Sequence, residues 1–123
     1  MSAVLFLTSD LMFSSRVAGA AKTLAVPLEL LADPAVLPTK LTADCRLVLI
    51  DLSLDRLNLP AAVRAVHAAA PQAQVIAFGP HVDHAALADA KEAGCNQVLS
   101  RAQFNQQYGE LLKQHATHAG GTS

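Results

Sequence analysis

The chain has 123 residues, of which 52% are hydrophobic and 15% charged, and its formal net charge is −1. This length suits one domain whose core needs neither disulfides nor metal, and the scattered charges form no basic stripe for nucleic acid. No apolar run approaches the roughly 18 residues of a membrane span, and no basic region with a cleavable apolar segment opens the chain. We therefore expect a cytoplasmic protein that binds neither nucleic acid nor membrane.

The chain begins with a short strand and an amphipathic helix. Residues 3–7 form an apolar run without charge, which predicts an interior strand. The run ends at Thr8-Ser9-Asp10, a polar cluster able to cap the helix that follows. Phe13, Val17 and Leu24 recur at helical spacing, so this helix should bury one side.

The next segment predicts an edge strand and a weak helix. Residues 26–31 predict a strand, and Pro27 favours the edge of the sheet because proline has no backbone N–H to donate to a neighbouring strand. Residues 33–44 contain Pro34 and Pro38, so their helix should be short and poorly formed.

The run Leu47-Val48-Leu49-Ile50-Asp51 places four aliphatic side chains directly before a carboxylate. A continuous apolar run without polar alternation predicts a central strand of a parallel sheet, covered on both faces. Asp51 then lies at the carboxyl end of the strand, where open α/β sheets bind their ligands. A turn or capping aspartate is the other interpretation of this position.

Strand and helix patterns continue to alternate in the second half. Asn58 or Leu59 begins a helix that Pro71 stops, and residues 74–78 form the fourth strand. Asp83 caps a helix that runs to Gly94.

Residues 97–99 form the fifth predicted strand, and a last helix follows with its apolar side at Phe104, Tyr108, Leu111 and Leu112. We expect one domain over residues 1–115 and a flexible tail over 116–123. Five strands alternating with five helices predict the α/β class, as a three-layer α/β/α sandwich with right-handed crossovers.

Several kinds of chemistry lack their motifs. The turn after the first strand has no glycines for a phosphate-binding loop, and Ser9, Ser53 and Ser100 lack the G-x-S-x-G neighbours of a serine nucleophile. His81 and His84 share a helical face, but the sequence supplies no third and fourth metal ligand. The same holds for His115 and His118, so we favour structural or solvent roles for all four histidines. Cys45 and Cys95 have no metal-ligand spacing and should be buried free thiols.

Three segments carry a family resemblance. Residues 49–54 (LIDLSL) look like a phosphoacceptor strand and its loop, residues 63–71 like a helix with a terminal proline, and residues 90–95 (AKEAGC) like an Ala-rich segment ending in Gly before a strand. Over about residues 3–114 the chain thus resembles the receiver domains of two-component response regulators, the CheY-like superfamily. The resemblance implies a flavodoxin-like fold, a five-stranded parallel sheet of order 2-1-3-4-5 with Asp51 where the order reverses.

The resemblance also implies a phosphorylation site, which this chain keeps only in part. An acidic pair after the first strand holds Mg²⁺ with the acceptor Asp in the family, and the matching residues here are Thr8 and Ser9, whose uncharged hydroxyls should bind Mg²⁺ poorly. Asp10 is one residue late, and only a shift of the strand end would bring it into the site.

Three further family positions also differ. The Thr or Ser after the fourth strand is replaced by Gly79, the Lys-Pro after the fifth by Arg101-Ala102, and the aromatic switch by Val98. Asp51 is the one member that is unchanged. Arg101 could pair with Asp51 through two parallel hydrogen bonds and take the electrostatic role of metal and Lys, or it could be a solvated residue at a helix start.

These departures predict a degenerate receiver, or pseudo-receiver: a non-enzymatic module that binds another signalling protein without a cofactor and without Mg²⁺-dependent phosphorylation. The alternative is a working receiver phosphorylated on Asp51 in a phosphorelay, with Mg²⁺ held by Asp51 and Asp10. A small-ligand site beside Gly79 is a third interpretation, and a homodimer is left open.

The resemblance marks the fourth helix, fifth strand and fifth helix as the output face, and we expect this face to stay in one arrangement because Gly79 and Val98 lack the hydroxyl and the ring that couple it to the site. The candidate interaction residues are Lys91, Gln97, Val98, Gln106, Gln107 and Tyr108. Tyr108 is the expected anchor, although it could also only pack the last helix onto the sheet.

Overall fold

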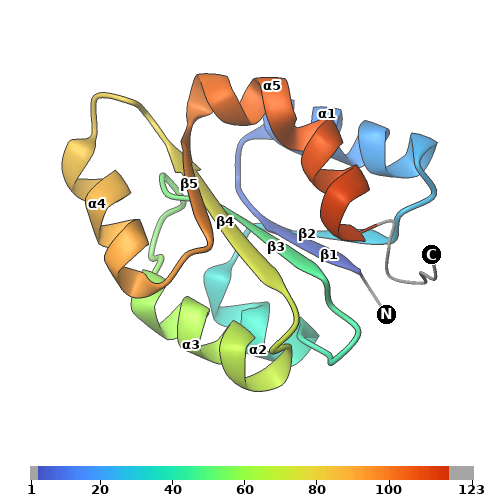
Figure 1. Cartoon of the computed structure of the whole chain (residues 1–123), viewed down its shortest axis with the longest axis horizontal. Coiled ribbons are helices and arrows are strands. Elements are labelled where there is room, and N and C mark those ends of the chain that lie inside the picture. The colour runs from blue at the N-terminus through green and yellow to red at the C-terminus, as the bar shows by residue number, and fades with distance from the viewer. Residues whose placement is uncertain (1–2, 117–123) are drawn as a thin grey trace.

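The computed structural model describes residues 3–116 of the chain. In these residues a five-stranded parallel sheet has the order β2-β1-β3-β4-β5, with helices on both of its faces (Figure 1). The strands are β1 Val4–Leu7, β2 Leu28–Leu31, β3 Leu47–Asp51, β4 Gln74–Gly79 and β5 Gln97–Ser100. The predicted flavodoxin-like fold, strand order and parallel pairing are confirmed.

Five helices connect and follow the strands. They are α1 Leu11–Thr23, α2 Leu37–Lys40, α3 Leu59–Ala69, α4 His84–Ala93 and α5 Arg101–Leu111, with a 3₁₀ turn at Pro34–Val36 before α2 and a π turn at Leu112–Ala116 after α5. The short helix expected between residues 33 and 44 is therefore present as a 3₁₀ turn and one α-helical turn. The π turn carries regular backbone one residue past the predicted boundary at residue 115, and residues 117–123 of the predicted tail lie outside the described range.

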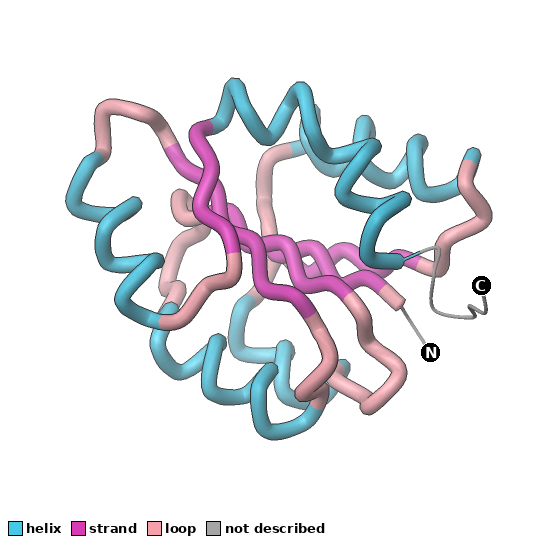
Figure 2. The backbone as a smooth tube through the Cα atoms, viewed as in Figure 1, coloured by secondary structure: helices cyan, strands magenta, loops and turns pink. Residues whose placement is uncertain are grey.

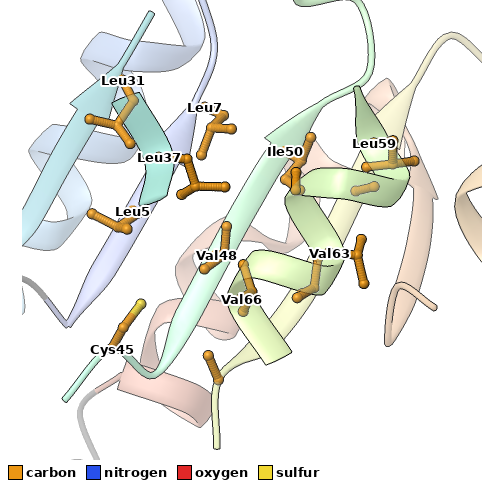
Figure 3. Packing of buried hydrophobic residues seen from close by; sticks show 14 of the residues in the cluster. Leu5, Leu7, Leu31, Leu37, Cys45, Val48, Ile50, Leu59, Val63 and Val66 are labelled. Carbon is orange, nitrogen blue, oxygen red and sulfur yellow. The ribbon is translucent and has the colours of Figure 1, made fainter. Parts of the chain in front are cut away.

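Successive side chains of the buried strands point to opposite faces of the sheet and contribute to two separate cores. Every residue of β3 is buried, as expected for a central parallel strand. Val48 and Ile50 point to the α2–α3 core, which contains Leu37 of α2 and Val63 and Val66 of α3 (Figure 3). Leu49 points to the opposite side, the α1–α5 core, where Phe6, Phe13, Phe78 and Phe104 pack together. Both faces of the sheet are thus covered by apolar side chains.

Capping side chains fix where the helices begin. Asp10, Asn58, Asp83 and Ser100 each accept a hydrogen bond from a backbone N–H in the first turn of α1, α3, α4 and α5. The loops that leave the carboxyl ends of the strands gather toward the upper left of Figure 2. This edge of the sheet therefore brings together polar residues that are far apart in the sequence.

Candidate functional site

Asp51 ends β3 at the point where the strand order reverses. The chain passes from β1 to β2 on one side and returns to β3 on the other, and the register pairs Leu7 with Ile50. Thr8 and Asp51, each one residue further along, are therefore neighbours. Both are buried, with 2% and 3% of their surface exposed. This is the position at which open α/β sheets place ligand-binding groups.

Both oxygens of the Asp51 carboxylate accept hydrogen bonds from the chain. The Thr8 hydroxyl donates to Oδ2 at 2.7 Å, and the Ser53 amide donates to Oδ1 at 2.9 Å. The Thr8 Oγ1 in turn accepts a hydrogen bond from the Asp10 amide at 3.1 Å. A buried carboxylate needs such donors to offset its lost hydration, so Thr8 acts as a structural partner of Asp51.

Arg101 joins this group from the start of α5, which makes the Asp51 cluster of Thr8, Asp10, Asp51, Ser53 and Arg101. Its Nη2 donates to Asp10 Oδ2 at 2.8 Å, whereas its Nη1 lies 3.8 Å from Asp51 Oδ1, too far for a hydrogen bond. The guanidinium also lies over the Phe13 ring, with Cζ 4.8 Å from the centroid.

The predicted two-bond pairing of Arg101 with Asp51 is therefore wrong. Thr8 and Ser53 already donate to the two Asp51 oxygens, while one oxygen of Asp10 is free to accept from Arg101. The guanidinium remains close enough to Asp51 for an ion pair without direct hydrogen bonding. The interpretation of Arg101 as a solvated helix-start residue is also incomplete, because two carboxylates face its side chain.

Asp10 links the cluster to α1. Its Oδ1 accepts from the Phe13 amide at 3.0 Å, and its Oδ2 accepts from Arg101. The hydrogen bond from Phe13 and, after it, the one from Arg101 lower the pKa of the Asp10 carboxyl against the opposing effect of desolvation. β1 ends at Leu7, so the strand end is not shifted toward Asp10. Asp10 joins the site because its side chain binds Arg101.

The donors of the Asp51 cluster, as arranged here, do not fit a Mg²⁺ site. The ion requires near-octahedral oxygen coordination, but the Arg101 guanidinium contacts both carboxylates, and the Thr8 hydroxyl directs its proton at Asp51. Ser9 is exposed. Nowhere in residues 3–116 do three or more His, Cys, Asp or Glu side chains come together in a way that could hold a metal.

Leu52 occupies the space beside Gly79. A Cβ at Gly79 would lie 3.4 Å from both Cβ and Cδ1 of Leu52, whose amide also donates to Phe78 O at 2.9 Å. This packing counts against a small-ligand site at Gly79. Val98, the position of the aromatic switch, is half-buried and packs against the α2–α3 core.

The candidate interaction residues lie on three elements around the β5 edge. Lys91 on α4 and Gln106 on α5 are exposed, while Gln97 on β5 and Gln107 and Tyr108 on α5 are half-buried. The Tyr108 ring lies 6.0 Å from the Phe104 ring and packs against the α1–α5 core. Tyr108 thus has a packing role and an exposed part at the same time.

The remaining predicted candidates are mostly peripheral. His81 and His84 are exposed, and Asp83 caps α4. Cys45 is a buried free thiol as predicted, but Cys95 is only half-buried because it lies in the turn after α4; partial burial still raises its pKa to about 11. His115 lies in the π turn and burial lowers its pKa, and His118 lies outside the described residues.

Besides the Arg101–Asp10 ion pair, the sequence analysis missed two contacts, the Thr8–Asp51 hydrogen bond and the packing of Leu52 over Gly79. The first had a signal, because the residue after β1 and the last residue of β3 must be neighbours in a parallel pair. The second had none, since the direction of the Leu52 side chain depends on the loop. Within the part of the chain that the structure describes, no helix has the length and apolar character needed to cross a membrane.

No protein-family model and no curated protein matches the sequence. Solved structures do match. The receiver domain of a sensor histidine kinase from Pseudomonas aeruginosa PAO1, with magnesium in its active-site cleft, has a TM-score of 0.67 and 16% identity, with 91% of this chain and 98% of that chain covered.

Two further structures are similar. The BeF3-activated DrrB receiver domain has a TM-score of 0.74 at 14% identity, with coverage of 93% and 96%. The receiver domain of NtrX from Brucella abortus has a TM-score of 0.69 at 16% identity, with coverage of 90% and 95%. At these identities the likeness establishes the fold: the chain has the fold of response-regulator receiver domains.

Proposed function

We propose that this chain, built on the receiver fold, is a pseudo-receiver: a non-enzymatic module of two-component signalling that binds another signalling protein. In this proposal Asp51 is not phosphorylated in a Mg²⁺-dependent reaction, and the module needs no cofactor. Fold alone does not determine function, so the proposal depends on the chemistry of the Asp51 cluster.

The observation that carries the proposal is the state of the Asp51 carboxylate, which is 3% exposed and hydrogen-bonded at both oxygens. A carboxylate that attacks a phosphoryl group must present a free oxygen to it. Each Asp51 oxygen keeps a second lone pair, so what opposes attack is burial, which leaves little of the carboxylate accessible to an incoming phosphoryl group. The attacking and incoming groups are both negative, and the metal that would offset their repulsion lacks a fitting set of ligands.

Arg101 gives the cluster a cation of its own. Asp10, Asp51 and Arg101 bring two negative charges and one positive charge together at the start of α1, the end of β3 and the start of α5. Since Arg is always protonated, this compensation does not depend on a metal or on phosphate. The charge compensation by Arg101 supports a site that holds α1, β3 and α5 in one fixed arrangement.

A working receiver phosphorylated on Asp51 is the alternative. One observation favours it: Asp10 and Asp51 both contact Arg101, at 2.8 and 3.8 Å, so two carboxylates already face one position. If Arg101 turned away, a metal ion could compete for that position.

Phosphorylation by a small phosphodonor separates the two functions. The chain is incubated with acetyl phosphate and Mg²⁺, and its intact mass is measured beside that of Asp51→Asn. We expect no difference between the two proteins. A phosphoryl adduct on the wild type that Asp51→Asn lacks would contradict the pseudo-receiver proposal and support the alternative.

The partner side of the proposal concerns Lys91, Gln97, Val98, Gln106, Gln107 and Tyr108. Without a hydroxyl at Gly79 or a ring at Val98, this face has no coupling groups and should be preformed, so a partner avoids the population penalty of a two-state switch. Asp51→Asn should then retain whatever partner the wild type captures from a native lysate.

Tyr108→Ala tests whether this face is the contact. We expect loss of the captured partner with a folded variant, checked by thermal melting. Lower stability with unchanged binding by the folded fraction would assign Tyr108 to packing and place the interaction elsewhere.

A further inference from the structure

A cavity of about 360 Å³ lies between the Pro34–Val36 turn with α2 on one side and the β3–α3 loop with α3 on the other. Its volume falls in the range of small-molecule sites, roughly 300–1,000 Å³. α2 and α3 are neighbours on this face of the sheet, and Leu37 lies between α2 and the strands (Figure 3). The cavity is separate from the Asp51 cluster, with which it shares no residue.

The walls of the cavity are mostly apolar. Leu37 and Pro38 line one side, and Ala61 and Ala65 of α3 line the other. α2 has a single helical turn, and small alanine side chains face it from α3. The space that a longer helix or larger side chains would fill is therefore open, and it suits a short aliphatic or aromatic group.

The two walls carry opposite charges that do not pair. Asp33 stands on the wall of the 3₁₀ turn and Arg56 on the wall of the β3–α3 loop, and both are exposed. One Asp33 oxygen accepts from the Ala35 amide, but no cation within the described range contacts the carboxylate. In residues 3–116, no hydrogen bond or ion pair reaches the Arg56 guanidinium.

Arg56 also has an unfavourable backbone conformation. Its φ is 62°, in the left-handed region that costs a non-glycine residue about 1–2 kcal/mol. Among residues 3–116, no hydrogen bond or ion pair of the side chain offsets this cost. Ala25 has a similar φ of 58°, so a positive φ alone does not mark a site, but at Arg56 it coincides with an unpaired charge beside a cavity.

The geometry points to a binding site for a small zwitterion, an α-amino acid with an apolar side chain. Its carboxylate pairs with Arg56, its ammonium group pairs with Asp33, and its side chain lies between Leu37 and Ala65. Asp33 follows β2 and Arg56 follows β3, so the site lies at the edge where open α/β sheets take ligands. This inference goes beyond the proposed function and stands whether or not Asp51 is phosphorylated.

The test is a titration of the ¹⁵N-labelled full chain, followed by amide chemical shifts. The probes are L-alanine, L-leucine and L-phenylalanine. For the one that binds most tightly, the N-acetyl acid, the amino amide and the N-acetyl amide remove the positive charge, the negative charge or both. We expect saturable shifts at Ala35, Arg56, Ala61 and Ala65, and about tenfold weaker binding for each analogue that lacks one charge.

Two variants and one control assign the charges. Arg56→Gln and Asp33→Asn should each weaken binding about tenfold. Arg64→Gln, an exposed position on α3 that does not line this cavity, should leave it unchanged. The shifts themselves report that each variant is folded. The proposal is overturned if none of the three amino acids gives saturable shifts at these residues, or if the uncharged N-acetyl amide binds as tightly as its parent amino acid.

Discussion

Two groups of charged residues lie beyond the carboxyl ends of the strands, and they differ in how their charges are satisfied. In the Asp51 cluster, the buried carboxylate accepts from Thr8 and Ser53, and Arg101 pairs with Asp10. At the cavity between α2 and α3, Asp33 and Arg56 are exposed and have no ionic partner among residues 3–116. Burial explains the difference, because a buried charge without partners costs several kcal/mol, whereas an exposed one is hydrated by water.

This difference indicates which of the two groups is available to bind a ligand. A polar cluster that is complete within the chain adds stability and offers little to a ligand. An incomplete one beside an open cavity adds no stability but retains its charges for a ligand. Substitutions in the first group should therefore lower stability, and substitutions in the second should leave it unchanged or raise it.

The largest effect is expected for Thr8→Val, which keeps the shape of the side chain and removes its hydroxyl. Asp51 Oδ2 would then be buried without a donor, and the free energy of unfolding should fall by about 2–3 kcal/mol. Urea denaturation measures it. Ser9→Ala, an exposed neighbour, is the control and should change stability by less than about 0.5 kcal/mol. Equal stability of the two variants would show that the Thr8–Asp51 hydrogen bond does not hold the cluster together.

A smaller loss is expected for Arg101→Gln. The side chain is 32% exposed, so the ion pair with Asp10 and the contact with the Phe13 ring together should contribute only about 1 kcal/mol. Arg16→Gln is a matched control, since Arg16 also bridges α1 and α5, through Asn105 at 2.8 Å on the exposed surface.

Removing the guanidinium also leaves two carboxylates facing one position, so Mn²⁺ should bind Arg101→Gln more tightly than the wild type by isothermal titration. Equal metal affinity of wild type, Arg101→Gln and Arg16→Gln would contradict the assignment of Arg101 as the internal cation of the site.

At the cavity between α2 and α3, a substitution should raise the free energy of unfolding instead of lowering it. Arg56→Gly removes the strain at a φ of 62° and, within residues 3–116, no hydrogen bond or ion pair, so the free energy of unfolding should rise by about 0.5–1 kcal/mol. Arg64→Gly, in the interior of α3, should instead lower it by about 1 kcal/mol. Both are measured in the same urea series. Destabilisation by Arg56→Gly would mean that the Arg56 side chain makes stabilising contacts in solution.

The smallest expected effect is the pH dependence of the stability that Asp10 contributes. The folded-state pKa of Asp10 lies below its ordinary value of 3.8, so its charge contributes stability that is fully present above that pH and is lost as the pH falls through the lower folded-state pKa. Asp10→Asn keeps an acceptor for the Phe13 amide and removes the charge. The difference in stability between wild type and Asp10→Asn, a fraction of a kcal/mol, should shrink below pH 3.8. A difference that grows in acid would contradict the lowered pKa.

The fold could be predicted from the sequence because its signals are local. β3 and β1 are continuous apolar runs, and the starts of α1, α3 and α4 have capping side chains at Asp10, Asn58 and Asp83. Pro34 and Pro38 correctly indicated a weak second helix.

The sequence predicts a site with Thr8, Asp10, Asp51 and Arg101, but not how these residues pair or that the Ser53 amide joins them. By sequence Asp10 is one residue too late for the site, yet it reaches the cluster because the Arg101 side chain spans the distance from α5. Thr8 replaces a carboxylate of the family pattern, while its hydroxyl donates to Asp51. The cavity beside Arg56 depends on two features: the shortness of α2, which Pro34 and Pro38 indicate, and a left-handed residue in a loop, which has no clear sequence signal.

In the pseudo-receiver proposal, burial and partners within the chain close Asp51 to metal and phosphoryl groups. The most direct measurement follows the amide shifts of Thr8, Asp51 and Ser53 while Mg²⁺ and beryllofluoride are added to the wild-type protein. We expect no saturable change at these residues at millimolar metal. Saturable shifts centred on Asp51, absent in Asp51→Asn, would show that the carboxylate is accessible and that the chain is a working receiver.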